Sequence, residues 1–205
     1  RGAHSRSGVR ERLGIFGGTF DPPHIGHLVT AVNVRHDLDL DRVLLVVNNV
    51  PWQKVGSREI SSAEARLQMV EAAVADVPGL EPSRLEIDAG GLSYTADTLA
   101  TLLAEDPSRE LFVILGADAA AGILTWDRYE EVREMATIVA VARPGAARAT
   151  PPPGDWRWIE VEVPHLEVSS TDLRQRVADG RPLDYLVTHE VVDCIEALGL
   201  YQEGG

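Results

Sequence analysis

The stretch GGTFDPPHIGH, residues 17 to 27, places two histidines three positions apart, after a glycine pair and a proline pair. Imidazoles at this spacing share a helix face, where they could bind a metal, transfer protons or donate hydrogen bonds to anionic oxygens. No Cys, Asp or Glu follows His24 and His27 nearby at the spacing that zinc needs. The histidines could also simply cap and pack a helix. Phosphate binding explains more of the stretch, because glycine lets a ligand approach the backbone and a helix start offers free N–H groups.

A second candidate for phosphate binding is the segment SSTDLR, residues 169 to 174. Ser169, Ser170 or Thr171 could cap the helix that this pattern predicts. Free backbone N–H groups and the guanidinium of Arg174, one turn in, could then meet phosphate oxygens. The alternative interpretation is a plain N-cap with no ligand.

The charge balance of the chain limits its partners. A formal net charge of −13 argues against wholesale electrostatic binding to nucleic acid or to an anionic membrane surface. An anionic small molecule could still bind where a few cations and backbone amides converge. Lys54 is the single lysine of the chain; it could act as a mobile charge on phosphate or be one solvated surface side chain.

The common nucleotide-binding fingerprints are missing from the chain. No G-x-G-x-x-G follows the first predicted strand, and no G-x-x-x-x-G-K-[ST] occurs anywhere. The pattern therefore indicates neither an ordinary dehydrogenase nor a P-loop protein.

Length and composition predict one soluble globular domain. The chain has 205 residues, of which 44% are hydrophobic and 25% charged. Its longest mostly apolar run, residues 111 to 124, is too short to cross a bilayer, so we expect no membrane span. Cys194 alone forms no internal disulfide, and the expected location is the reducing cytoplasm. We interpret residues 1–12 as a flexible lead-in or a remnant of cloning, and residues 13–201 as the single domain.

Hydrophobic periodicity predicts the elements that must position these residues. Strands are expected over residues 13–16, 42–47, 110–118, 136–145 and 158–163, with a weaker candidate over 85–87. Helices are expected from the entry at Pro22-Pro23, behind a capping box at Ser61 and Glu64, and over 95–103, 129–135, 169–180 and 190–198. Strands that alternate with helices predict a doubly wound parallel α/β sheet, which binds ligands beyond the carboxyl ends of its strands.

GGTFDPPHIGH resembles the signature of the nucleotidyltransferases that carry an H-x-G-H motif, here His24-Ile25-Gly26-His27, and SSTDLR resembles their second motif. The resemblance implies a Rossmann-like nucleotidyltransferase fold in which the two histidines hold the triphosphate of ATP and stabilise a pentavalent transition state. It implies His24, His27, Lys54 and Arg174 as catalytic residues. The ATP-binding residues that it implies are Gly17, Gly18, Thr19, Phe20, His24, His27, Gly116, Asp118, Arg143, Ser169, Ser170, Thr171 and Arg174.

Further matches resemble the bacterial nicotinate-nucleotide adenylyltransferases. SYTADTL, residues 93–99, resembles the segment that helps hold the pyridine carboxylate, while GAD, 116–118, resembles the ribose contact and ARPG, 142–145, the loop near the adenine. PWQK, 51–54, departs from many relatives, which have proline and histidine there, and the loop after residue 143 is long. Trp126 matches the aromatic residue on which the pyridine stacks, although four tryptophans could equally serve the core. The implied mononucleotide-binding residues are Trp52, Lys54, Ser93, Tyr94, Thr95 and Trp126.

The resemblance implies transfer of AMP from ATP to the 5′-phosphate of nicotinate mononucleotide, with release of pyrophosphate, in NAD biosynthesis. A general base is not required, because the second pKa of the attacking phosphate is about 6. Mg²⁺ is expected with ATP, bound mainly by substrate oxygens and water rather than by a protein site. The alternatives are a related adenylyl- or cytidylyltransferase that accepts pantetheine phosphate or nicotinamide mononucleotide, and a noncatalytic nucleotide sensor. The preference for acid or amide substrate, and whether the chain forms a homo-oligomer, stay open.

Overall fold

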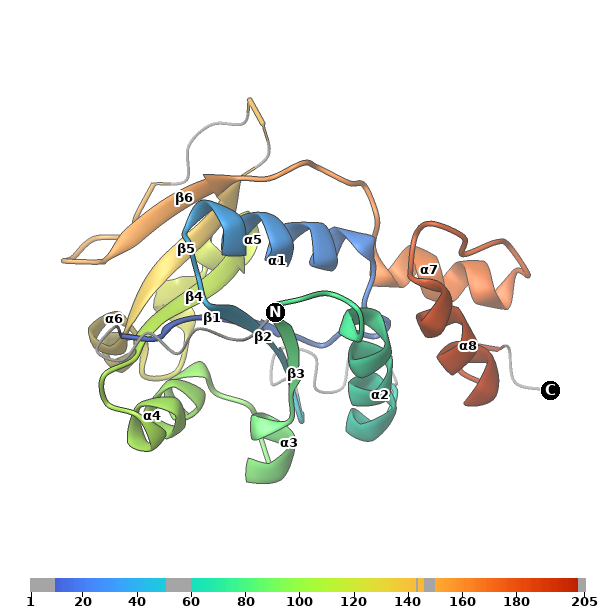
Figure 1. Cartoon of the computed structure of the whole chain (residues 1–205), viewed down its shortest axis with the longest axis horizontal. Helices are drawn as coiled ribbons and strands as arrows, with labels where there is room; N and C mark the ends of the chain where they lie inside the picture. The colour runs from blue at the N-terminus through green and yellow to red at the C-terminus, as the bar shows by residue number, and fades with distance from the viewer. Residues whose placement is uncertain (1–9, 51–59, 143, 146–149, 203–205) are drawn as a thin grey trace, which may run out of the picture.

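In the part of the chain that the structure describes, six parallel strands form one sheet in the order β3-β2-β1-β4-β5-β6 (Figure 1). The computed structural model describes residues 10–50, 60–142, 144–145 and 150–202. The strands are β1 (Arg12–Gly18), β2 (Arg42–Val47), β3 (Leu80–Ser83), β4 (Glu110–Gly116), β5 (Ala136–Ala142) and β6 (Trp158–Glu162). Four of them, β1, β2, β4 and β5, are nearly continuous apolar runs, as expected of strands that are covered on both faces.

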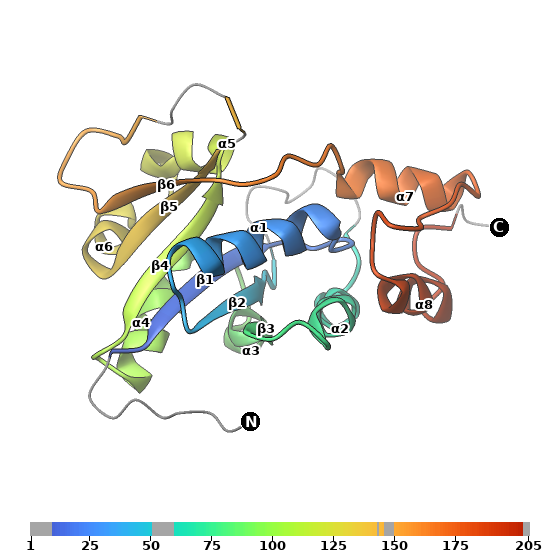
Figure 2. The ribbon, with the colours of Figure 1, turned by 45° about the horizontal axis from the view of Figure 1, so that its top comes forward.

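Helices cover both faces of the sheet. One core cluster joins the sheet to α1 (Ile25–Asp37), α2 (Ala63–Val74), α7 (Ser170–Ala178) and α8 (His189–Ala197). The other joins the opposite face to α4 (Thr95–Glu105), α5 (Ala117–Ala121), the 3-10 turn η2 (Ile123–Thr125) and α6 (Tyr129–Met135). In Figure 2, α1 lies along the sheet while α7 and α8 gather beside α2. The short helix α3 (Leu85–Ala89) follows β3. The predicted doubly wound α/β fold is confirmed.

The topology reverses between β1 and β4. From β1 the chain winds outward through β2 to β3, and it then crosses back to pair β4 with the other edge of β1. Ligands of such sheets bind beyond the carboxyl ends of the strands at this switch point. Gly17 and Gly18 end β1 there, and Gly116 ends β4.

The strand predicted over residues 85–87 is wrong, because these residues open α3. Leu85, Glu86 and Ile87 alternate between apolar and polar as in a strand, but so short a segment does not distinguish the period of a strand from that of a helix. The ion pair between Arg84 and Asp88, 2.8 Å and four residues apart, fits the helix. The third strand instead occupies Leu80–Ser83 at the sheet edge, where Pro82 is tolerated.

Two helix starts differ from their predictions. The capping box of Ser61 and Glu64 does not form: Ser62 caps α2 by accepting a hydrogen bond from the backbone N–H of Ala65 at 3.2 Å. Glu64 instead pairs with Arg84 at 3.0 Å. The proline pair at residues 22–23 precedes α1 rather than lying in its first turn, since the N-cap is a histidine one residue later.

Candidate functional site

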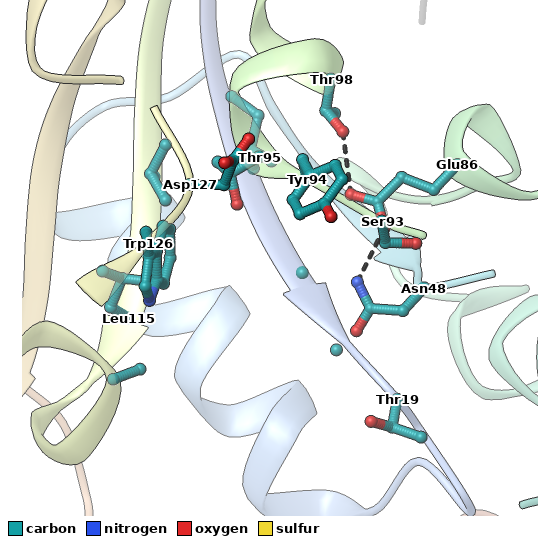
Figure 3. Close-up of a pocket in the computed structure, with 15 residues that line it drawn as sticks. Thr19, Asn48, Glu86, Ser93, Tyr94, Thr95, Thr98, Leu115, Trp126 and Asp127 are labelled. Atoms are coloured by element: carbon teal, nitrogen blue, oxygen red, sulfur yellow. Dashed lines mark hydrogen bonds between the residues drawn. The ribbon is translucent and has the colours of Figure 1, made fainter. Parts of the chain in front are cut away.

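Two cavities lie at the switch point, one on either side of Thr19. The first, of about 410 Å³, is here called the histidine cavity; its lining residues are Thr19, Phe20, Asp21, His24, His27, Val168, Ser169, Ser170, Thr171 and Arg174. The second, of about 300 Å³, is called the tryptophan cavity (Figure 3); its lining residues are Ile15, Gly17, Gly18, Thr19, Asn48, Glu86, Ser93, Tyr94, Thr95, Thr98, Val113, Leu115, Ala119, Trp126 and Asp127. Because both include Thr19, a molecule bound in one would meet a molecule bound in the other at this residue.

The loop that follows β1 depends on its glycines. A Cβ at Gly18 would lie only 2.8 Å from Cζ of the buried Phe20 ring, so this position has no room for a side chain. Gly17 has no atom within 4 Å of such a Cβ, and it lines the tryptophan cavity. One glycine therefore admits the Phe20 ring, and the other exposes the backbone to the cavity.

His24 and His27 form a stacked pair at the start of α1. Their ring centroids are 3.7 Å apart with an angle of 28° between the planes. The backbone N–H of His24, the N-cap, donates to Nδ1 of His27 at 3.1 Å, so the neutral His27 ring carries its proton on Nε2. Between them, a Cβ at Gly26 would lie 3.0 Å from Nδ1 of His24. The glycine of the H-x-G-H motif thus makes room for the ring that precedes it.

Burial keeps the His24 ring neutral. Desolvation lowers the pKa of His24 from 6.5 to about 4. Its Nδ1 atom is buried and makes no hydrogen bond within the part of the chain that the structure describes. At neutral pH His24 therefore offers a neutral imidazole rather than a fixed positive charge.

Helix α7 forms the opposite wall of the histidine cavity. Ser169 is its N-cap and accepts from the backbone N–H of Asp172 at 3.2 Å, as the cap pattern predicts. The hydroxyl of Ser170 donates to the carbonyl oxygen of Pro22 at 2.8 Å, 148 residues away in the sequence. Arg174 donates through Nη1 to the carbonyl oxygen of Asp21 at 2.7 Å. The two segments singled out in the sequence are therefore bonded directly to each other.

Asp21 also bonds to a residue from the C-terminal part of the sequence, Tyr201. Its side chain is 1% exposed, and its Oδ1 accepts a 2.6 Å hydrogen bond from the hydroxyl of Tyr201. Burial, with the hydrogen bond to Asp21, raises the pKa of Tyr201, so the phenol stays protonated and donates. The Asp21 carboxylate therefore points toward the protein interior, where it accepts the Tyr201 hydrogen bond.

The tryptophan cavity is lined by side chains from β1 and β4, from α3 and α4, and from the loop before α4 (Figure 3). Trp126 follows η2 and packs against the core under α4 and α6. Tyr94 is the N-cap of α4 and Thr95 its first residue, and both line the cavity. The first backbone N–H groups of α4, which have no acceptor within the helix, therefore lie next to the cavity. Ser93 is 8% exposed and accepts from the backbone N–H of Asn49 at 2.9 Å, which ties the loop after β2 to this segment.

The sequence interpretation missed a polar network in the wall of the tryptophan cavity. Glu86, 8% exposed, accepts from Nδ2 of Asn48 at 2.7 Å and from the hydroxyl of Thr98 at 2.8 Å (Figure 3). The wrong strand assignment concealed Glu86: the structure instead places this residue on helix α3, where its carboxylate is buried.

Arg66 was missed too, although its side chain holds the backbone of residues that line both cavities. Its side chain is 1% exposed on α2. It donates to the carbonyl oxygens of Thr19 (2.9 Å), Asn48 (2.8 Å), Asn49 (3.0 Å) and Ser61 (2.9 Å). The available signal was an arginine flanked by Ala65 and Leu67 on the apolar side of a predicted helix.

The remaining predicted site residues fall in two groups. Gly116 ends β4 and Asp118 lies in the first turn of α5; both are exposed and line neither of the two cavities. Trp52, Lys54 and Arg143 lie outside the described residues. Within the described residues, no helix is long and apolar enough to cross a membrane.

Comparison with known proteins shows where this architecture occurs. The profile of the cytidylyltransferase-like family matches residues 15–176. A probable nicotinate-nucleotide adenylyltransferase of Mycolicibacterium vanbaalenii is 43% identical, over 96% of this chain and 94% of its own. Another from Acidothermus cellulolyticus is 44% identical, over 97% and 99%.

The fold also matches a solved structure. The nicotinic acid mononucleotide adenylyltransferase of Plasmodium falciparum, in complex with NaAD, superposes with a TM-score of 0.75 over 94% of this chain and 98% of that one, at 17% identity. At that identity the likeness concerns the fold, whereas the bacterial relatives match in sequence over nearly the full length. The chain therefore belongs to the cytidylyltransferase-like family, and within it to the nicotinate-nucleotide adenylyltransferases.

Proposed function

We propose that this enzyme transfers AMP from ATP to the 5′-phosphate of nicotinate mononucleotide, giving nicotinate adenine dinucleotide and pyrophosphate. The observation that carries the proposal is the junction of the two cavities at Thr19. A triphosphate in the histidine cavity and a mononucleotide in the tryptophan cavity would bring their phosphates together at that residue. The near full-length likeness to bacterial nicotinate-nucleotide adenylyltransferases supports the same reaction.

The chemistry needs no nucleophile from the protein. An oxygen of the mononucleotide phosphate attacks the α-phosphorus of ATP, the bond to the β-phosphate oxygen breaks, and pyrophosphate leaves with that electron pair. The protein aligns the two phosphates and disperses the charge that grows on the leaving group. We propose that this task falls to donors that line the histidine cavity: the imidazoles of His24 and His27, the guanidinium of Arg174 and the N–H groups at the start of α7. Lys54, which follows β2 in the sequence, is proposed as a further cation.

The mononucleotide base is proposed to lie at the far end of the tryptophan cavity. Trp126 offers an aromatic face to the pyridine ring. The backbone N–H groups where α4 begins, at Tyr94 and Thr95, suit the pyridine carboxylate, because a helix N-terminus favours negative charge. These contacts would make the acid the preferred substrate over the uncharged amide.

Mg²⁺ is proposed to enter with ATP. Within the described residues no group of three His, Cys, Asp or Glu side chains is arranged to hold a metal ion. The carboxylate of Asp21, which lines the histidine cavity, is bonded to Tyr201. The oxygens of the phosphates and water are the donors that Mg²⁺ prefers, and the ion would neutralise part of the triphosphate charge. We propose residues 13–201 as a single catalytic domain that works in the cytoplasm, where its substrates are available.

The test is pyrophosphate release with ATP·Mg²⁺ and three acceptors in parallel: nicotinate mononucleotide, nicotinamide mononucleotide and phosphopantetheine. The acid mononucleotide is expected to give the highest kcat/KM, about tenfold or more above the amide, since the amide loses the charged interaction at α4. Preferred turnover of phosphopantetheine would instead indicate a different adenylyltransferase. ATP binding without pyrophosphate release from any acceptor would indicate a nucleotide sensor.

A further inference from the structure

The carboxylate of Glu86 has no task in the reaction proposed above, yet it lies in the wall of the tryptophan cavity. Its Oε2 accepts from Nδ2 of Asn48 at 2.7 Å, and its Oε1 accepts from the hydroxyl of Thr98 at 2.8 Å. Only 8% of the residue is exposed. Both carboxylate oxygens are thus engaged by side chains from other elements, which makes Glu86 a hub of the wall rather than a free charge in the cavity.

This hub determines which end of the Asn48 amide faces the cavity. A carboxylate only accepts hydrogen bonds, so it selects the NH₂ group of the amide. Figure 3 shows the amide nitrogen bonded to Glu86 and the oxygen turned away from it. The Asn48 backbone is fixed as well: its N–H donates to Gly18 at 3.0 Å and its carbonyl accepts from Arg66 at 2.8 Å. Asn48 therefore presents one acceptor, Oδ1, in a fixed place.

The position of Asn48 indicates which part of a ligand meets that acceptor. In Figure 3 it lies between Tyr94 and Thr19, with Trp126 across the cavity. If the base stacks at Trp126 and the phosphate lies near Thr19, the sugar occupies the space between them. The pyridine carboxylate and the ionised phosphate carry no donors, whereas the ribose carries two hydroxyl groups that can donate.

We propose that Glu86 is a positioning residue: it orients Asn48 so that Oδ1 accepts a hydrogen bond from a ribose hydroxyl, and this makes the enzyme selective for an intact ribose. The inference rests on the proposed function. Glu86 acts here entirely through Asn48 and does not itself touch the substrate.

The test compares kcat/KM for nicotinate mononucleotide with that for its 2′-deoxy and 3′-deoxy analogues. The wild-type enzyme is expected to use at least one analogue about tenfold or more less well, because the loss of the hydroxyl leaves Oδ1 without its donor. Asn48→Ala and Glu86→Met are each expected to reduce that ratio to about twofold and to raise KM for the mononucleotide, with KM for ATP unchanged. The double variant should resemble either single variant, since both act on one hydrogen bond.

Glutamine supplies a conservative variant that avoids a cavity. In Glu86→Gln the new amide oxygen can still accept from Asn48 while its NH₂ donates to the Thr98 hydroxyl, so discrimination should survive. In Thr98→Val alone the carboxylate still holds Asn48, and discrimination should survive again. When the two changes are combined, the glutamine NH₂ loses its acceptor at residue 98 and turns to Oδ1 of Asn48; discrimination should then be lost.

Each outcome decides the inference. It is overturned if wild type uses both deoxy analogues as well as the parent, if Glu86→Met and Asn48→Ala have additive effects, or if the combined Gln and Val variant discriminates like wild type. Failure of the proposed function looks different: wild type would then release no pyrophosphate with nicotinate mononucleotide itself, and both proposals would fall together. Thermal unfolding of every variant separates loss of folding from loss of discrimination.

Discussion

The histidine cavity and the tryptophan cavity share Thr19 but are built in different ways. The histidine cavity takes its wall from two short segments, residues 19–27 and 168–174, and Ser170 and Arg174 of the second segment donate to the backbone carbonyls of Pro22 and Asp21 in the first. The tryptophan cavity collects single residues from strands, helices and loops, and its polar wall depends on Glu86.

The difference follows from the ligands that the two cavities suit. Phosphate can be held by generic means, namely helix N-termini and a few N–H donors, and in the histidine cavity these come from two short segments of the sequence. A base and sugar need acceptors and donors at particular points, and these come from distant parts of the chain. If the two cavities are separable, a substitution confined to one of them should leave substrate binding in the other largely unchanged.

The largest effect is expected from the histidine pair. His27→Ala and His27→Asn should each lower kcat by about 10²–10³-fold, because both remove the Nε2–H donor from the leaving phosphates. Steady-state kinetics with either substrate varied checks this. Asparagine keeps an acceptor for the His24 backbone N–H, so that variant should unfold at nearly the wild-type temperature. A large rise in KM for the mononucleotide with kcat preserved would contradict the separation of the cavities.

Substitution of Arg66 should disturb both cavities together. Arg66→Met keeps the apolar stem but leaves four backbone carbonyls without their donor, among them those of Thr19 and Asn48. We expect a loss of about 3 kcal/mol or more in the free energy of unfolding, measured by urea titration. Arg66→Lys keeps the charge but not the fork of donors, and should recover only part of the loss. If the Arg66→Met protein were as stable as wild type, the view that Arg66 supports both cavities would be wrong.

A fall in pH should lower the free energy of unfolding through His24. The pKa of His24 is about 4 in the folded protein against 6.5 ordinarily, so the unfolded chain binds more protons between these values and stability falls as the pH falls. From about pH 7 to about pH 5 this contributes about 2 kcal/mol of lost unfolding free energy. Urea titrations at both pH values should show a drop smaller by that amount in His24→Asn. An equal drop in both proteins would mean that His24 titrates normally.

The smallest effect is expected from Trp126. Trp126→Ala should raise KM for nicotinate mononucleotide about tenfold through loss of stacking, with kcat and KM for ATP nearly unchanged. Trp126→Phe keeps an aromatic face and should recover most of the affinity. Initial rates at varied mononucleotide concentration check both variants. A parallel rise in KM for ATP would show that the two cavities do not act independently.

The fold was largely predictable because its signals are local. Apolar runs at β1, β2, β4 and β5 and the helical period of α1, α4 and α7 appear in the sequence, and their alternation indicates the parallel sheet. The capping box at Ser61 failed by one residue, since adjacent serines compete for the same role. The segment at Leu85 failed because five residues do not establish a period.

The histidine cavity was predictable for the same reason, and the hidden part of the tryptophan cavity was not. His24, His27 and Ser169–Arg174 carry their chemistry within a few positions of each other. Asn48, Glu86 and Thr98 stand 38 and 12 residues apart, on a loop and two different helices, and their side chains meet only in the folded structure. Arg66 was hidden for the same reason, since its four carbonyl partners come from three separate segments, at Thr19, at residues 48–49 and at Ser61.

The hydrogen bond from Tyr201 to Asp21 has a consequence for the biosynthesis of the protein. It joins residues 180 positions apart, so the loop that carries the glycine pair leaves the ribosome long before its last buried partner does. Until then, the carboxylate of Asp21 lacks the phenol that keeps it turned inward. A nascent chain that has already formed β1 and β2 therefore holds the first motif in an unfinished state, and the histidine cavity gains this support only after Tyr201 has been synthesised.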